Sequence, residues 1–280
     1  MFSTIGHTFE LMKMSWNVLM KDKELIFFPI FAAVGLGILL AVFFGLGTAL
    51  GTLDRFASET DSANLGDVIF VVFFFFCSYF ITIFFNAALI SAALERLRGG
   101  DPNVRSGLTH ALGHIHTILG WAIISATVGL VLMLLRSRSN NFLTRLVIDL
   151  IGGAWGFMTF FVVPVLVSEG LGPIAAIKRS AGLIRQTWGR QITSSFGFFL
   201  VYLAAALIGV LPAILFGMLA PVAGIAVGLV TVSAAMGAVQ AMEGIFKAAL
   251  YEYALGERPA EFDLRTLQGA YRPAPGASPA

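Results

Sequence analysis

Charge is scarce in this sequence. Asp, Glu, Lys and Arg make up 12% of its 280 residues and hydrophobic residues 58%, against about 25% and roughly 45–50% in an average soluble domain. One soluble core cannot hide so large an apolar excess. The composition therefore excludes an ordinary soluble domain and predicts an integral membrane protein.

Cysteine, histidine and clustered basic residues are also few. Cys77 is the only cysteine, which excludes a disulfide framework and a thiolate metal site. His110 and His114 share a helix face, but two ligands do not complete a zinc site. The net charge is +2 and no basic run reaches five residues, so we expect no nucleic-acid partner.

Motifs that carry chemistry are missing too. The sequence has no P-loop, no Ser-His-Asp arrangement and no Gly-rich dinucleotide motif in a βαβ context. We therefore expect no enzymatic activity, no catalytic residue, no metal and no cofactor.

Long uncharged runs dominate what is present. A membrane-spanning helix needs about 20 apolar residues, and four runs provide one span each: Leu25–Leu50, Val68–Leu94, Ile118–Leu135 and Leu150–Ser168. A fifth run, Gln191–Met242, is too long for one span. It predicts two more spans that reverse between Pro212 and Pro221, or a re-entrant hairpin at that place.

Basic residues predict the orientation of the six spans. Cytoplasmic loops retain Lys and Arg, and alternate loops divide the 18 basic residues into fourteen on one side and four on the other. The four are Arg55, Arg136, Arg138 and Arg145. We therefore expect both termini to lie in the cytoplasm, in a bacterial inner membrane.

Three amphipathic segments precede the first, third and fifth spans. Their apolar residues recur every three or four positions over 2–19, 104–118 and 174–188. Such helices lie in the membrane interface, or they cover the bundle as cytoplasmic lids; both interpretations stay open. The residues expected to contact anionic headgroups are Lys178, Arg179, Arg185 and Arg190.

The chain also predicts a parallel internal repeat. Residues 1–98, 99–170 and 171–258 each contain one amphipathic helix and two spans, and together form one membrane domain, 1–258; residues 259–280 are expected to be disordered. Phe85–Leu94 matches Phe246–Leu255 at six of ten positions, and Lys13-Met-Ser15 resembles Lys178-Arg-Ser180 at a similar offset.

Ionisable residues in the spans are hypotheses for function. Polar residues form a stripe on the sixth helix that suits a pore or a proton path: Ser233, Gln240, Glu243 and Lys247. Glu243 and Lys247 are also spaced for an ordinary ion pair at the cytoplasmic interface. Asp149 is expected at the start of the fourth span, where the helix dipole favours a carboxylate.

The segment Phe160-Phe161-Val-Val-Pro164-Val-Leu-Val-Ser-Glu169-Gly170, with the following residues to Ser180, resembles an uncharacterised family of six-helix prokaryotic membrane proteins. More distantly it is similar to the membrane domain of some bacterial glycerophosphoryl diester phosphodiesterases. The resemblance implies six helices and no established activity, and it transfers no catalytic residue.

These observations predict an all-α, polytopic bundle of six spans and three cytoplasmic amphipathic helices. Its expected function is non-enzymatic interaction with membrane lipids, or with other membrane proteins, through the basic amphipathic helices. The alternative is a transporter or channel for ions or small solutes that uses the polar stripe.

Overall fold

The computed structural model of the chain describes residues 2–58, 64–139, 141–188, 195–218, 220–259 and 262. The helices are α1 (Phe2–Lys21), the 3-10 helix η1 (Lys23–Ile26), α2 (Phe27–Ala49), α3 (Thr52–Ala57), α4 (Leu65–Leu97), α5 (Val104–Gly113), α6 (Ile115–Arg138), α7 (Phe142–Met158), α8 (Val162–Glu169), α9 (Pro173–Trp188), α10 (Ser195–Gly217) and α11 (Pro221–Ala254). No strand occurs in the described ranges, so the predicted all-α class is confirmed.

Five helical segments are long and apolar enough to cross a membrane. They are Lys23–Ala49, Leu65–Leu97, Ile115–Arg138, Phe142–Glu169 and Pro221–Ala254. Four of them cover the first four predicted spans, apart from Leu50 at the end of the first, and α11 contains most of the sixth. The predicted fifth span falls on α10, of which Val201–Gly217 forms a shorter apolar helix.

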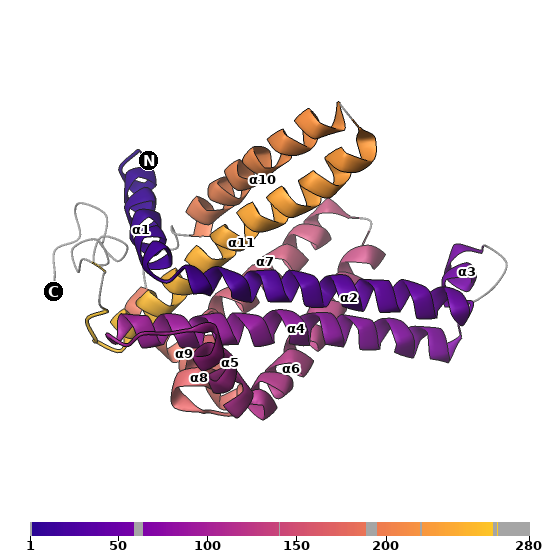
Figure 1. The fold of residues 1–280 in the computed structure, drawn as a ribbon. Helices are drawn as coiled ribbons and strands as arrows, with labels where there is room; N and C mark the ends of the chain where they lie inside the picture. The colour runs from indigo at the N-terminus through magenta and orange to yellow at the C-terminus, as the bar shows by residue number, and fades with distance from the viewer. Residues whose placement is uncertain are drawn as a thin grey trace.

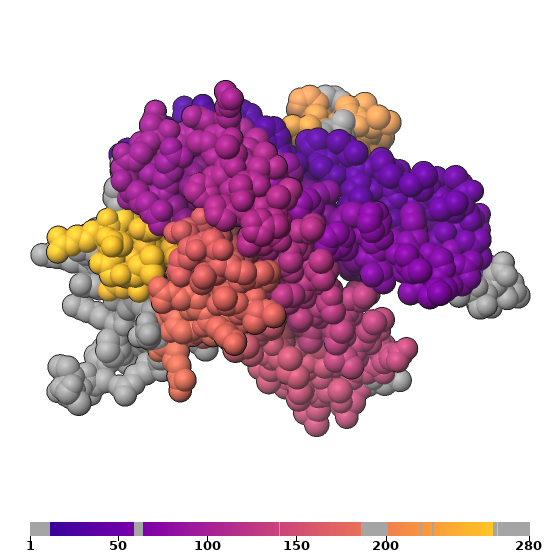
Figure 2. Space-filling view, turned by 90° about the horizontal axis from the view of Figure 1, so that it is seen from below, coloured from indigo at the N-terminus to yellow at the C-terminus, as the bar shows by residue number. Residues whose placement is uncertain are grey.

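The long helices form three hairpins that spread from a common base (Figure 1). The hairpins are α2 with α4, α6 with α7 and α8, and α10 with α11; each follows one shorter helix, namely α1, α5 or α9. Seen from below, the α2–α4 arm and the α6–α7 arm separate toward their tips (Figure 2). This order of elements is the one expected for the three proposed repeat units.

The core lies at the base, where the second arm of each hairpin ends. Nearly every side chain is buried over residues 87–94 of α4, 162–167 of α8 and 245–252 of α11. Gly244 lets α11 approach α4, because a Cβ there would lie 2.5 Å from Leu89 Cδ2. Both copies of the ten-residue match therefore contribute most of their length to the core.

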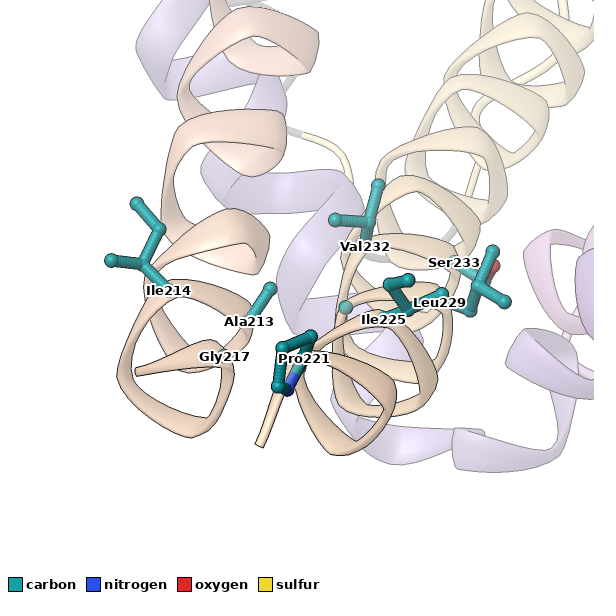
Figure 3. Close-up of a pocket in the computed structure, with 10 residues that line it drawn as sticks. Ala213, Ile214, Gly217, Pro221, Ile225, Leu229, Val232 and Ser233 are labelled. Atoms are coloured by element: carbon teal, nitrogen blue, oxygen red, sulfur yellow. The ribbon is translucent and has the colours of Figure 1, made fainter. Parts of the chain in front are cut away.

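The α10–α11 hairpin is packed through small residues. Gly209, Ala213 and Gly217 recur every four residues along α10, and a Cβ added at Gly224 of α11 would run into the Gly217 backbone. Without a hydrophobic driving force between helices in lipid, such faces allow close van der Waals packing. Figure 3 shows the apolar pocket, about 500 Å³, between the two helices near their turn.

The two prolines of this hairpin occupy different positions in their helices. Pro221 is the first residue of α11, as expected for the start of the second span. Pro212 lies inside α10, five residues before its end. The chain reverses after Gly217 and before Pro221, between the two prolines as expected, although Pro212 does not end α10.

The fourth predicted span begins earlier than expected and is broken. It starts at Phe142, and the regular helix stops at Met158 and resumes at Val162. Pro164 explains the break, since a proline cannot donate to the carbonyl four residues before it and its ring collides with that carbonyl. Asp149 lies well inside α7 and pairs with Arg136 at 3.1 Å, so its expected position at a helix start is wrong.

The shorter helices each bury one face, which overlaps the predicted apolar stripe in part. On α9 the stripe residue Ile184 is buried with Ala176, Ser180 and Leu183, whereas Ile174 is exposed. On α1 the stripe residues Met12 and Leu19 are buried with Ser15, whereas Trp16 is exposed. Apolar spacing therefore indicates the side that packs on the bundle, but not each buried residue.

Candidate functional site

A cavity of about 600 Å³ lies between the arms, at the level of the spans. Its walls come from α2, α4, α6, α7, α8 and α11, and every lining residue lies within one of the five candidate membrane spans. Apolar and aromatic side chains cover most of the wall. The polar lining side chains are Ser78, Tyr79, Thr82, Asn86, Ser125, Thr159 and Lys247.

Lys247 is the charged residue of the cavity wall. Its Nζ lies 2.8 Å from Glu243 Oε1, one helical turn earlier on α11, and 5.5 Å from the centre of the Phe160 ring. Tyr202 of α10 donates its hydroxyl to Glu243 Oε2 at 2.7 Å. The carboxylate thus has a partner on each oxygen, and the charge of Lys247 is balanced.

This ion pair is partly buried, and its expected place at the cytoplasmic interface stays a prediction. The side chains of Lys247 and Glu243 are 22% and 29% exposed. The structure also places Asn86, the residue that aligns with Lys247 in the ten-residue match, on the wall of the same cavity. Equivalent positions of α4 and α11 therefore meet at one site.

Several polar groups of the cavity wall have no hydrogen-bond partner within the described part of the chain. The Ser125 hydroxyl oxygen is buried and unbonded, and among the described residues neither the Asn86 side chain nor the Tyr79 hydroxyl has a hydrogen bond. Gly129 makes room for Tyr79, because any Cβ there would collide with the tyrosine hydroxyl. A buried polar atom is normally paired, so the Ser125 oxygen, with the half-buried Asn86 and Tyr79 on the same wall, singles out the cavity.

Aromatic side chains line the same cavity. Trp121 of α6 and Trp155 of α7 are stacked, with ring centroids 6.0 Å apart. The Trp121 side chain is buried. The two rings hold α6 and α7 together on one side of the cavity.

The other residues of the predicted polar stripe lie elsewhere. Ser233 lines the apolar α10–α11 pocket (Figure 3). Gln240 is half-buried and lines neither this pocket nor the larger cavity. The structure therefore brings together the Glu243–Lys247 end of the stripe with residues of α4 and α6, and does not bring Ser233 to that place.

The four residues expected to contact headgroups differ in their surroundings. Lys178 and Arg185 are exposed, and α9 lies open on the face seen from below (Figure 2). Arg179 is engaged, since its Nε lies 3.0 Å from Glu169 Oε1. Arg190 lies outside the described residues.

A polar network at the base joins the three hairpins. Arg98, which follows α4, contacts Glu252 Oε1 at 2.8 Å and Ser168 Oγ at 2.8 Å. Tyr251 donates to Glu169 Oε1 at 2.9 Å. Sequence reasoning missed this network because its members are far apart in the chain; the one available signal was a carboxylate, Glu252, within the last long apolar helix.

The histidines form no metal centre in the described structure. His110 and His114 are stacked, with ring centroids 5.0 Å apart, and His110 Nε2 lies 2.9 Å from the Val167 carbonyl oxygen. No group of three or more His, Cys, Asp or Glu side chains within the described ranges is placed to hold a metal ion.

Comparison with known proteins adds one finding to this geometry. Residues 66–260 match the model of a family of unknown function, DUF6159. The chain belongs to the DUF6159 family. No curated protein and no solved structure matches it. The expected likeness of this DUF6159 member to the membrane domain of glycerophosphoryl diester phosphodiesterases stays a prediction.

Proposed function

We propose that this DUF6159 member is a non-enzymatic, six-span protein of the bacterial cytoplasmic membrane with both termini in the cytoplasm. The five apolar helices support its placement in a membrane. The span added to these five is α10, the fifth in chain order, which packs along α11 over most of its length and carries exposed apolar side chains such as Leu207, Leu211 and Leu215. In a bilayer those side chains face lipid.

We further propose that the protein binds anionic phospholipid headgroups on α9. The observation that carries this function is the exposure of Lys178 and Arg185 on a helix that packs on the bundle through its opposite face. Neither has an ion-pair partner among the described residues. A basic side chain near an anionic membrane surface contributes about 1 kcal/mol. Arg179 contributes less, because Glu169 already balances its charge.

The test is the double substitution Lys178→Ala/Arg185→Ala in the full chain. We expect the phosphatidylglycerol that co-purifies with the protein, measured by mass spectrometry, to fall severalfold. The matched control is Arg136→Ala/Arg138→Ala, which removes two exposed charges at the opposite end of the spans. Equal phospholipid retention in both variants would reject the headgroup role.

Transport is the second candidate function, and the cavity favours it. Polar side chains from four helices and the Glu243–Lys247 pair meet at the level of the spans. Ionisable residues at that depth commonly mark solute or proton paths. Glu243→Gln is expected to abolish solute flux in proteoliposomes; flux equal to that of the unchanged protein counts against transport.

A further inference from the structure

We infer that the cavity bounded by α4, α6, α7 and α11 is a binding site for one phospholipid, separate from the headgroup surface on α9. The phosphate and glycerol region would lie against Asn86, Ser125 and Lys247, with the acyl chains leaving between the arms. The inference rests on the membrane placement proposed above. It does not require that α9 binds lipid or that the protein transports a solute.

The unpartnered polar groups indicate a bound molecule. Ser125, Asn86 and Tyr79 come from two different helices, α4 and α6, and line one cavity without hydrogen-bond partners among the described residues; the Ser125 oxygen is buried and the other two side chains are half-buried. Within a bilayer, water is scarce and an unpaired polar group is costly. A molecule that brings hydrogen-bonding oxygens into the cavity removes that cost.

The hydrogen-bond donors and acceptors of the cavity wall indicate which chemical group a ligand would carry. Lys247 has three N–H donors, of which its known partner Glu243 takes one, and Asn86, Ser125 and Tyr79 supply further donors. Glu243 is already engaged by Lys247 and Tyr202 and does not line the cavity. The wall therefore suits a group rich in acceptor oxygens, such as a phosphodiester, better than one that carries an ammonium.

The apolar lining and the location argue for a lipid. Leu36, Val128 and Leu132 form apolar wall beside the polar groups, and all lining residues lie in candidate membrane spans. Ligand sites of about 300–1,000 Å³ are typical for small molecules, so the cavity holds the polar part of a phospholipid but not its full chains. Phosphatidylglycerol, which lacks an ammonium, is the expected occupant.

A blocking substitution tests the site directly. Gly156 lines the cavity and has open space around its Cβ position, so Gly156→Leu fills the cavity without a clash in the fold. Gly153, on the same helix, also has open space but does not line the cavity, which makes Gly153→Leu the matched control. Delipidated full-length protein is titrated with phosphatidylglycerol, and bound lipid is counted by native mass spectrometry.

We expect Gly156→Leu to weaken one binding event by about tenfold or more, while Gly153→Leu and Lys178→Ala/Arg185→Ala retain that event. Asn86→Leu and Ser125→Ala, which remove polar groups of the wall, should weaken it severalfold. Equal lipid binding by Gly156→Leu and Gly153→Leu would overturn the inference. So would displacement of the lipid by inorganic phosphate or glycerol phosphate, which would assign the cavity to a soluble anion.

Discussion

Ser180 shows how one residue stabilises a broken span. Its hydroxyl donates to the Met158 carbonyl at 2.7 Å and accepts from the Phe161 amide at 3.0 Å. These are the backbone groups freed where α7 stops and α8 begins. Ser180 is fully buried, so no solvent replaces it. Ser15, its counterpart in the proposed repeat, is fully buried as well.

Ser180→Ala should lower the free energy of unfolding by about 2 kcal/mol, because two buried backbone groups lose their partner. Unfolding by detergent titration measures the difference. Ser137→Ala is the control, since Ser137 is exposed and bonds only within its own helix; its stability should stay close to that of the unchanged chain. Equal stability of the two variants would show that the Ser180 bridge contributes nothing.

The Arg98–Glu252 ion pair is a second interaction of single residues that stabilises the fold. The Glu252 side chain is 5% exposed, and Arg98 reaches it from the end of a different hairpin. Arg98→Ala should destabilise the protein by about 2 kcal/mol, between the values typical of exposed and buried pairs. The exchange Arg98→Glu/Glu252→Arg should recover part of the loss in the same unfolding measurement; no recovery would contradict a direct pairing.

At the scale of elements, the α10–α11 hairpin depends on helix proximity. A Cβ at Gly209 would lie 2.8 Å from Val232 Cα, and the Thr231 hydroxyl donates to the Gly209 carbonyl at 2.5 Å. The two backbones are therefore in contact. A larger side chain at one of these glycines would push the two helices apart.

Gly224→Val should weaken this hairpin by about 1–3 kcal/mol, the usual cost of overpacking. Faster amide hydrogen exchange confined to α10 and the first half of α11 would report the loss. Gly37→Val on α2 is the control, because its Cβ position has open space. Unchanged exchange in Gly224→Val would contradict the tight packing.

The sequence predicted the elements better than their breaks and faces. Uncharged runs located the long helices because length and hydropathy are local properties. The break before Pro164 was readable, since proline disfavours a helical bond to Phe160, but the bond partner Ser180 lies on another element. On α1 and α9 the predicted stripes include buried residues such as Leu19 and Ile184, but the exact buried face depends on which helices they meet.

At the scale of the whole molecule, the candidate site was predicted only in part. The spacing of Glu243 and Lys247 indicated their pairing, and the internal match linked Lys247 to Asn86. The contribution of Ser125, Tyr79 and Trp155 depends on how three hairpins meet at one place. No periodicity within a single helix carries that information.

The three hairpins also place the connections at opposite ends of the molecule (Figure 1). The base gathers the ends of α4, α8 and α11, and the tips carry α3 and the α6–α7 and α10–α11 turns. If α10 spans the membrane, α9 and the residues after α11 share one side; if it does not, they lie on opposite sides.

Cysteine labelling tests this arrangement most directly. In a Cys77→Ser background, Lys178→Cys, Glu257→Cys and Arg138→Cys place single thiols at exposed positions after the fourth span, after α11 and at the end of α6. With a membrane-impermeant maleimide, we expect Arg138→Cys to be labelled from outside the cell, and Lys178→Cys and Glu257→Cys only in inside-out vesicles. Labelling of Glu257→Cys from outside would contradict six spans, and labelling of Lys178→Cys from outside would contradict a cytoplasmic α9.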